Sequence, residues 1–375
     1  MRYRPRCRVL PLAGLLAALL ASAAQVQAQA QSPPQDQPAP ATPPAQTPSP
    51  QATQPQAAQP QAAQPEAAPQ APSVQELLSG VVRIKTFINP DGRTVENLGR
   101  EREGSGVVID GTGLIVTIGY LMVEAHAAEV ITNDGRTVPA NVVGYDHETG
   151  FGILQAIAPL KVRPMAFGKS SELKQGEIVI VASGGGADHA APVAIASKRE
   201  FAGSWEYLLD EAIFTAPPHS EWSGAALISR AGKLVGIGSL IVGDATGDGS
   251  ATPGNMFVPI DRLPPILADL MSDGRVANSG PPWLGFTTEE LRGRLIVSKV
   301  IPGGPAEKAG LARGTVIVGV AGQEAKTLAD FYRKVRALGR AGVNVPLDVM
   351  QNSEARHVDI KSMNRLDHLK LKSTF

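Results

Sequence analysis

Residues 104–117 read Gly-Ser-Gly-Val-Val-Ile-Asp-Gly-Thr-Gly-Leu-Ile-Val-Thr. Two short runs rich in Val, Ile and Leu flank an Asp-Gly turn, which is the pattern of two adjacent β-strands. Similar runs, separated by Gly, Asp-Gly and Pro, continue to about residue 260. The strands expected among them include 81–87, 105–110, 114–117, 129–132, 177–182, 225–228 and 234–241. Strands of this length and spacing indicate an all-β barrel or sandwich.

The residues that precede this β region differ from it in composition. Residues 1–30 begin with a basic stretch, continue with an apolar run and end among small residues, which is typical of a signal peptide removed on export. Residues 31–72 consist almost wholly of Pro, Gln and Ala, so they are expected to form a disordered linker. The motif Ser73-Val-Gln-Glu76 predicts a short capped helix at the start of the folded part.

A second folded region follows the β region. Residues 263–271 predict a helix, 272–281 a hinge, and the pattern up to about residue 360 alternates strands and helices. A chain of 375 residues is too long for one ordinary core. The sequence therefore predicts a mainly β domain at 73–278, a smaller α+β domain at 279–362 and a tail at 363–375.

Cysteine content and charge restrict the kinds of site that the chain can hold. The only cysteine, Cys7, lies in the expected signal peptide, so the processed chain would have no disulfide, thiolate metal site or cysteine nucleophile. No later apolar stretch reaches the ~18 residues of a membrane span. Residues 281–375 hold 15 Lys and Arg against 9 Asp and Glu, and residues 31–280 hold 16 against 26. This asymmetry suits docking between the domains, an anionic partner or an ordinary solvated surface. No metal, cofactor or nucleic-acid site is expected.

The β region resembles the HtrA-type trypsin-like serine proteases. Besides residues 104–117, the resemblance rests on Val142-Val-Gly-Tyr-Asp146, Phe151-Gly-Ile-Leu154, Ser223-Gly224 and Gly232-Lys-Leu-Val-Gly-Ile237, which follow in the family's order. The resemblance implies a trypsin-like double β-barrel, a periplasmic location and a trimeric assembly.

The resemblance fails at the residues that would carry catalysis. Tyr120 and Gly150 stand where the family has its catalytic His and Asp, and Glu221 replaces a glycine of the oxyanion hole, while Ser223 keeps the nucleophile position. A phenol with a pKa of about 10 is a poor general base at neutral pH, and a carboxylate beside the developing oxyanion opposes acyl transfer. These changes predict a pseudoprotease.

The alternative is an active serine endopeptidase in which another histidine of the β region serves as the base for Ser223. The candidates for this substitute base are His126, His147, His189 and His219.

The second region resembles a PDZ domain. The run Gly304-Pro-Ala-Glu-Lys-Ala-Gly-Leu311 is typical of HtrA-family PDZ domains, and residues 283–286 look like a carboxylate-binding loop. Such a loop holds a peptide's terminal carboxylate with backbone N–H groups, and the strand that follows pairs with the peptide. The predicted peptide-binding residues are Trp283, Leu284, Gly285 and Phe286. The helix expected at 327–338 carries one apolar stripe that lines either the core or the peptide groove, formed by Leu328, Phe331, Val335 and Leu338.

These resemblances imply an exported HtrA-like pseudoprotease in protein quality control. Its PDZ domain would bind peptide segments or misfolded envelope proteins, and the protein would act as an adaptor, chaperone or regulator, in oligomers with itself or with active relatives. A structural envelope tether that uses only the linker and the PDZ domain is a further alternative.

Overall fold

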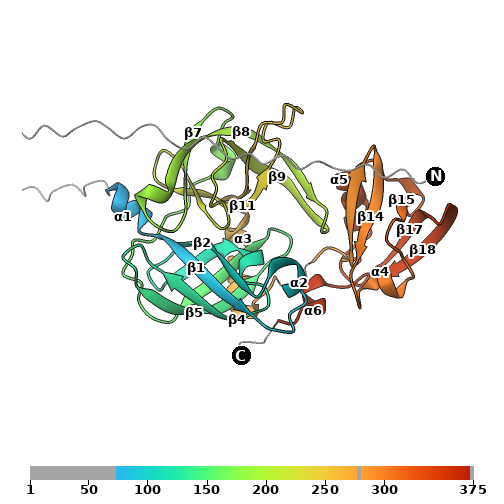
Figure 1. Cartoon of the computed structure of the whole chain (residues 1–375), viewed down its shortest axis with the longest axis horizontal. Helices are drawn as coiled ribbons and strands as arrows, with labels where there is room; N and C mark the ends of the chain where they lie inside the picture. The colour runs from blue at the N-terminus through green and yellow to red at the C-terminus, as the bar shows by residue number, and fades with distance from the viewer. Residues whose placement is uncertain (1–72, 277–279, 372–375) are drawn as a thin grey trace, which may run out of the picture. The chain divides into compact units, whose positions relative to one another are not determined.

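Two closed six-stranded antiparallel barrels form the larger part of the fold in the computed structural model, which describes residues 73–276 and 280–371 (Figure 1). The first barrel closes in the order β1-β2-β3-β6-β5-β4. Its strands are β1 (Val81–Ile88), β2 (Glu101–Val108), β3 (Leu114–Ile118), β4 (Ala125–Ile131), β5 (Thr137–Tyr145) and β6 (Phe151–Ala156). The expected signal peptide at 1–30 and linker at 31–72 lie outside the described residues.

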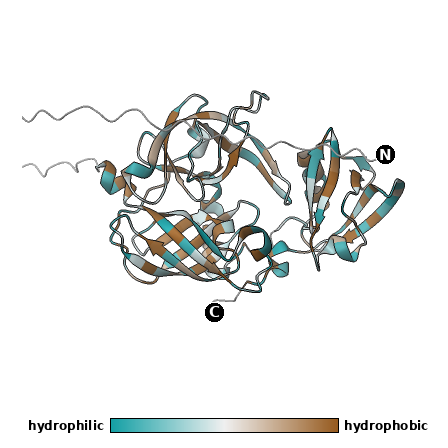
Figure 2. Ribbon diagram, viewed as in Figure 1, coloured by the Kyte–Doolittle hydropathy of each residue, from teal (hydrophilic) through white to brown (hydrophobic). Residues whose placement is uncertain are grey.

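The second barrel closes in the order β10-β11-β12-β9-β8-β7. Its strands are β7 (Ile178–Ala182), β8 (Ala190–Gly203), β9 (Tyr207–Ala216), β10 (Ala226–Ile228), β11 (Leu234–Val242) and β12 (Gly254–Pro259). Apolar residues recur along the barrel strands (Figure 2). The strands β3, β10 and β12 are buried along their whole length, whereas the middle and end of β1 alternate between buried and more exposed residues. The expectation of a trypsin-like double barrel is confirmed.

Separate apolar clusters fill the two barrels and the region where they meet. Ile84, Ile115 and Leu154 belong to the cluster of the first barrel, and Leu227 and Phe257 to that of the second. A third cluster draws buried side chains from both barrels. Burial of apolar area on this scale is the main stabilising contribution to such a fold.

Short helices and turns connect and flank the barrels. The expected cap is present, since the Ser73 hydroxyl accepts a hydrogen bond from Glu76 N and the Glu76 carboxylate accepts one from Ser73 N at 2.9 Å. The α-helices of this part are α1 (Val74–Leu78), α2 (Val95–Leu98) and α3 (Pro264–Asp273), and the 3-10 turns are η1 (Gly119–Leu121), η2 (Ser170–Glu172), η3 (Ala187–His189) and η4 (Ile260–Arg262). No helix in the described ranges is both long and apolar enough to cross a membrane.

The second region is an antiparallel sheet with three short helices. The sheet runs in the order β13-β14-β15-β17-β18, and β16 pairs with β15. The strands are β13 (Phe286–Leu291), β14 (Arg294–Val300), β15 (Val316–Val320), β16 (Gln323–Glu324), β17 (Asn344–Gln351) and β18 (Glu354–Lys361), and the helices are α4 (Pro305–Lys308), α5 (Leu328–Ala337) and α6 (Arg365–His368). Three residues of the apolar stripe of α5, Leu328, Phe331 and Val335, are buried in one apolar cluster that also includes Leu208 of the second barrel, whereas Leu338 is 37% exposed.

Several elements differ from the sequence-based expectation. The strand expected at 129–132 begins earlier, at Ala125, and α3 extends to Asp273. The long hairpin of β8 and β9 is not evident from the sequence pattern, because β8 is rich in Ala and charged residues and contains Pro192. The expected tail contains α6 and returns to the first barrel, where Lys370 N donates to the Glu124 carboxylate at 2.7 Å.

Candidate functional site

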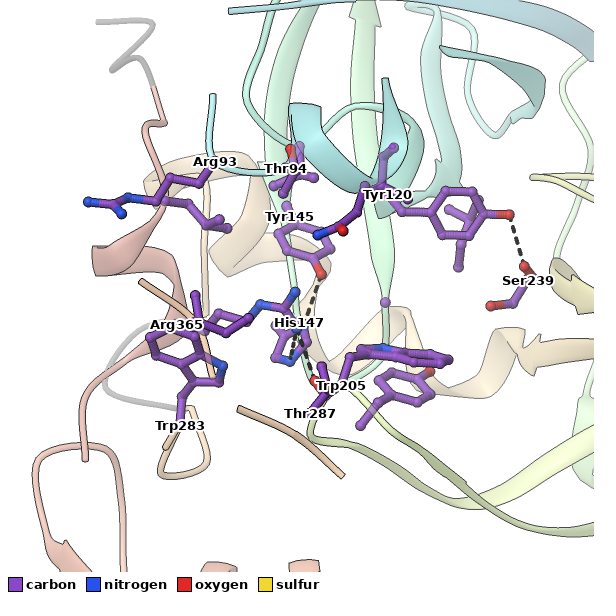
Figure 3. A pocket seen from close by; sticks show the side chains of 18 of the residues that line it. Arg93, Thr94, Tyr120, Tyr145, His147, Trp205, Ser239, Trp283, Thr287 and Arg365 are labelled. Carbon is purple, nitrogen blue, oxygen red and sulfur yellow. Dashed lines mark hydrogen bonds between the residues drawn. The ribbon is translucent and has the colours of Figure 1, made fainter. Parts of the chain in front are cut away.

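Tyr120 and Ser223 come from different barrels and meet at their hydroxyl groups. Tyr120 lies in η1, directly after β3, and Ser223 lies in the turn before β10. The Tyr120 hydroxyl oxygen is 2.9 Å from Ser223 Oγ, and it donates to the Ser239 carbonyl oxygen at 2.8 Å (Figure 3). A phenol has one proton to donate. Since that proton is directed to Ser239, the Ser223 hydroxyl is the donor in its bond with Tyr120.

This arrangement holds the serine proton without removing it. Burial raises the pKa of Tyr120 to about 12, so the phenol stays neutral at physiological pH. A neutral phenol oxygen is a far weaker base than an imidazole nitrogen, which is the usual partner of a serine nucleophile. Tyr120 is therefore a structural partner of Ser223 rather than a general base.

Two of the candidate histidines gather around Ser183 instead of Ser223. His219 Nε2 lies 3.1 Å from Ser183 Oγ, and His189 Nδ1 lies 2.8 Å from the Glu221 carboxylate. Glu221 also accepts a bond from Ser183 Oγ at 2.6 Å, and this bond is the main cause that lowers the pKa of the Glu221 carboxyl. The Glu221 carboxylate is thus charged and bonded to His189 and Ser183.

The other two histidines are also engaged or placed elsewhere. His147 is buried, and its ring nitrogens lie 3.0 Å from the Tyr145 hydroxyl and 2.9 Å from Arg365 Nη1. Burial lowers its pKa well below the ordinary value. His126 is exposed on β4. Across residues 73–276 and 280–371, no histidine donates to or accepts from the Ser223 hydroxyl.

Gly150 contributes only backbone groups to the site. Its φ of +84° lies in the left-handed region that favours glycine, and its carbonyl oxygen accepts a bond from Gly119 N at 2.7 Å. A Cβ at this position would lie 3.4 Å from the Tyr207 hydroxyl, which donates to Thr149 O at 2.7 Å. Tyr207 therefore borders the space into which a side chain at position 150 would extend.

A cavity of about 700 Å³ opens beside this pair of hydroxyl groups. Tyr120, Trp222 and Ser239 form part of its wall, and Trp205 and Trp283 line it as well (Figure 3). A volume of this size with mostly aromatic and aliphatic walls is typical of ligand pockets. No group of three or more His, Cys, Asp or Glu side chains in the described part of the chain is placed to hold a metal ion.

The loop at 284–286 holds a carboxylate in this structure. Leu284 N and Gly285 N donate to the two carboxylate oxygens of Glu206 at 2.7 and 2.8 Å, and Phe286 N donates at 3.1 Å. Gly285 has a φ of +84°, and a Cβ there would lie 2.9 Å from Pro305 Cδ, so the loop geometry requires glycine. Three of the four predicted peptide-binding residues thus point their N–H groups at one acceptor.

Trp283 has a different role from its three neighbours. Its backbone N donates to Met363 O at 3.0 Å, and its ring lies 4.8 Å from that of His368. Trp283 therefore packs the loop against the returning tail instead of donating to the carboxylate.

Sequence reasoning missed Glu206. Its only local signal is a three-residue turn, Ser204-Trp205-Glu206, between two strands. Glu206 adopts a φ of +62°, which costs a residue other than Gly or Asn about 1–3 kcal/mol. Strain of this kind is typical of functional positions, but it is visible only in the structure.

Each of the two folded regions matches a known domain family. Residues 104–237 match the model of the trypsin-like peptidase domain, and residues 282–362 match that of the PDZ domain. The putative serine protease HhoA of Synechocystis is 29% identical over 301 residues, which are 72% of this chain and 74% of HhoA. The periplasmic pH-dependent serine endoprotease DegQ of Escherichia coli is 27% identical over 68% of this chain, but the match covers only 58% of DegQ.

A solved structure supports the same fold. A variant of the HtrA-type protease AlgW with a tripeptide is 21% identical and covers 78% of this chain and 96% of AlgW, with a TM-score of 0.50. The closed barrels, the order of the two domains and the named relatives all indicate the same architecture. The chain is HtrA-like: a trypsin-like peptidase domain is followed by one PDZ domain, and the relatives to which it is similar are serine proteases of the HtrA and DegP type.

Proposed function

We propose that this protein is an exported HtrA-like pseudoprotease whose PDZ domain captures peptide chains by their terminal carboxylate. The observation that carries this proposal is the convergence of Leu284 N, Gly285 N and Phe286 N on one carboxylate group. Three backbone donors in a buried loop are the chemistry with which PDZ domains recognise a C-terminus. The same donors would serve a peptide.

The geometry around Ser223 supports the non-catalytic half of the proposal. Acyl transfer needs a base that removes the serine proton and a carboxylate that orients this base. Ser223 instead donates to a neutral phenol, and Gly150 has no side chain to orient anything. Removal of the catalytic triad lowers kcat on the order of a million-fold in subtilisin, a protease of a different fold. Capture without cleavage is the activity that remains.

The relatives and the expected signal peptide support the proposed cellular role. Several relatives are named periplasmic endoproteases, and residues 1–30 have the pattern of an export signal. An exported protein that binds peptides and does not cut them would act as an adaptor, chaperone or regulator of envelope proteins. Oligomers with itself or with active relatives remain a prediction.

Binding of short fluorescein-labelled peptides, measured by fluorescence anisotropy, tests the proposal. Each peptide is prepared with a free C-terminal carboxylate and as its C-terminal amide, which removes the charge but keeps the sequence. We expect a subset of the free peptides to bind and their amides to lose binding. The proposal fails if no free peptide binds either to the protein or to a variant in which the loop has been freed by Glu206→Gly.

A further inference from the structure

The carboxylate-binding loop that the proposed function assigns to a peptide is already occupied by a segment of the same chain. The hairpin between β8 and β9 turns at Gly203–Tyr207, and Glu206 at its tip is 8% exposed. Both of its carboxylate oxygens are used, Oε2 by Leu284 N and Oε1 by Gly285 N and Phe286 N. This is the bonding that a peptide's terminal carboxylate would form with the loop.

The backbone of the hairpin tip also pairs with the strand next to the loop. Ser204 O accepts a hydrogen bond from Thr288 N of β13 at 2.9 Å. A peptide bound to a PDZ domain lies against this strand and adds to the sheet through its backbone. The hairpin therefore reproduces a second feature of a bound peptide.

Helix α5, which packs against β13, holds the hairpin as well. The surface formed by the 284–286 loop, β13 and α5 is called the PDZ groove. The Tyr332 hydroxyl donates to Gly203 O at 2.8 Å and accepts from Glu206 N at 3.1 Å. Arg336 Nη2 donates to Leu208 O at 3.2 Å. Polar contacts from the 284–286 loop, from β13 and from α5 thus all reach residues 203–208.

Leu208 supplies an apolar anchor. Its side chain is 2% exposed and belongs to the apolar cluster of the PDZ domain, together with Phe286, Phe331 and Val335. A bound C-terminal peptide combines a carboxylate, a backbone pairing and an apolar side chain in a pocket, and the hairpin presents all three.

Glu206 suits this contact better than it suits its turn. The left-handed position in a three-residue hairpin loop is one that Gly or Asn usually fills. A glutamate there gains nothing locally, but its carboxylate reaches the loop. Burial raises the pKa of Glu206 to about 7, against the opposing effect of the three N–H groups, so the docked carboxylate is held at a cost in solvation.

We infer that the β8–β9 hairpin is a built-in ligand of the PDZ groove, with the Glu206 carboxylate in the place of a peptide's C-terminus, and that an external chain binds only after displacing it. The inference rests on the proposed function of the loop as a peptide site and adds how that site is regulated. When only a fraction of the molecules has the hairpin released, the apparent affinity for a peptide is reduced by that fraction. Ligands must therefore carry a free carboxylate and an apolar residue to compete.

Comparison of the protein with Glu206→Gly tests the inference. Glycine tolerates the left-handed turn, so the substitution removes the internal carboxylate and keeps the hairpin. Glu200→Gln is the matched control, because Glu200 is on the same hairpin and pairs with Arg333 of α5 but does not reach the loop. Thermal unfolding followed by circular dichroism verifies that each variant is folded.

We expect Glu206→Gly to lower the Kd for a free-carboxylate peptide by about tenfold or more and Glu200→Gln to change it by less than about twofold. Amide hydrogen exchange at 284–286 should be slow in the protein without peptide and fast in Glu206→Gly. Equal peptide affinity of the protein and Glu206→Gly would overturn the inference and leave the proposed function standing. If no peptide binds to the protein or to Glu206→Gly, the proposed function fails. The exchange rates at 284–286 then decide whether the hairpin occupies the loop, and equal rates in the two proteins would overturn the inference.

Discussion

The hydroxyl oxygens of Tyr120 and Ser223 lie 2.9 Å apart, and the Tyr120 hydroxyl donates a hydrogen bond to the Ser239 carbonyl oxygen. The two residues come from different barrels, so the bond joins the barrels where a protease would have its base and nucleophile. In the proposed pseudoprotease, this hydrogen bond has a structural role in the place of a catalytic dyad. Changes at either residue should therefore be visible in stability rather than in catalysis.

Tyr120→Phe should destabilise the fold. The substitution leaves the Ser223 hydroxyl and the carbonyl of Ser239, which is 6% exposed, without their partner. An unsatisfied buried polar group costs about 1–3 kcal/mol, and we expect a loss of this size in the free energy of unfolding. Urea denaturation measures it. An unchanged midpoint would show that the bond contributes nothing.

Ser223→Ala should leave proteolysis unchanged, because the protein itself should not cleave. Digestion of casein by the protein and by the variant, followed over time, should both match the rate without protein. A serine-directed phosphonate probe should label neither, since Ser223 is not activated by a base. Cleavage that is reproducible and disappears in Ser223→Ala would establish the endopeptidase alternative instead.

Gly285→Ala should damage the carboxylate loop. The new Cβ would approach Pro305 Cδ to 2.9 Å and Pro305 N to 3.2 Å, in a left-handed conformation, so the loop must shift. We expect a loss of about 2–4 kcal/mol in the free energy of unfolding and weaker peptide binding in the Glu206→Gly background.

Gly293→Ala is the control for this prediction. Its φ is +70°, in the same domain, but a Cβ there would meet nothing within 4 Å. It should lose only the ~1–2 kcal/mol of the left-handed conformation and keep peptide binding. Equal effects of the two substitutions would contradict the steric role of Gly285.

Docking of the Glu206 side chain in the 284–286 loop should weaken as the pH rises. The docked carboxyl has a pKa of about 7, and its ordinary value is 4.5. The docked form binds the proton more tightly, so docking is fully stabilised below about pH 4.5 and loses that stabilisation as the pH rises through about 7. The charged and titratable groups near the carboxyl are Arg365 of α6 and Tyr332 of α5. His147 bonds to the backbone of Glu206, and burial keeps the pKa of His147 well below its ordinary value.

The Kd ratio of the protein to Glu206→Gly, measured for one peptide from about pH 5 to about pH 8, tests this titration. Effects of pH on the peptide itself cancel in the ratio. We expect the ratio to fall with rising pH, by at most about tenfold per unit between the two pKa values. A ratio that is constant or increases would contradict the assigned direction.

Much of the fold could be predicted from the sequence, because local sequence patterns determine where strands and capped helices form. Val- and Ile-rich runs separated by Gly turns predict the barrel strands, and Ser73 with Glu76 predicts the capped helix that the structure contains. The prediction that Tyr120 and Gly150 replace catalytic residues likewise rests on residue identity at a motif position. A weakly patterned segment such as β8 was missed for the same reason.

The tertiary structure alone decided which groups meet. The chain has 35 Asp and Glu residues, and nothing local to Glu206 marks it as the one that reaches Leu284 N, 78 positions away. Likewise, only the folded barrels show that His219 lies beside Ser183 and His189 beside Glu221. The hydrogen bond from the Tyr120 hydroxyl to Ser239 O is also visible only there. Strand patterns report which face of an element is buried, whereas the pairing of polar groups depends on how distant elements pack, and the sequence carries no local trace of that.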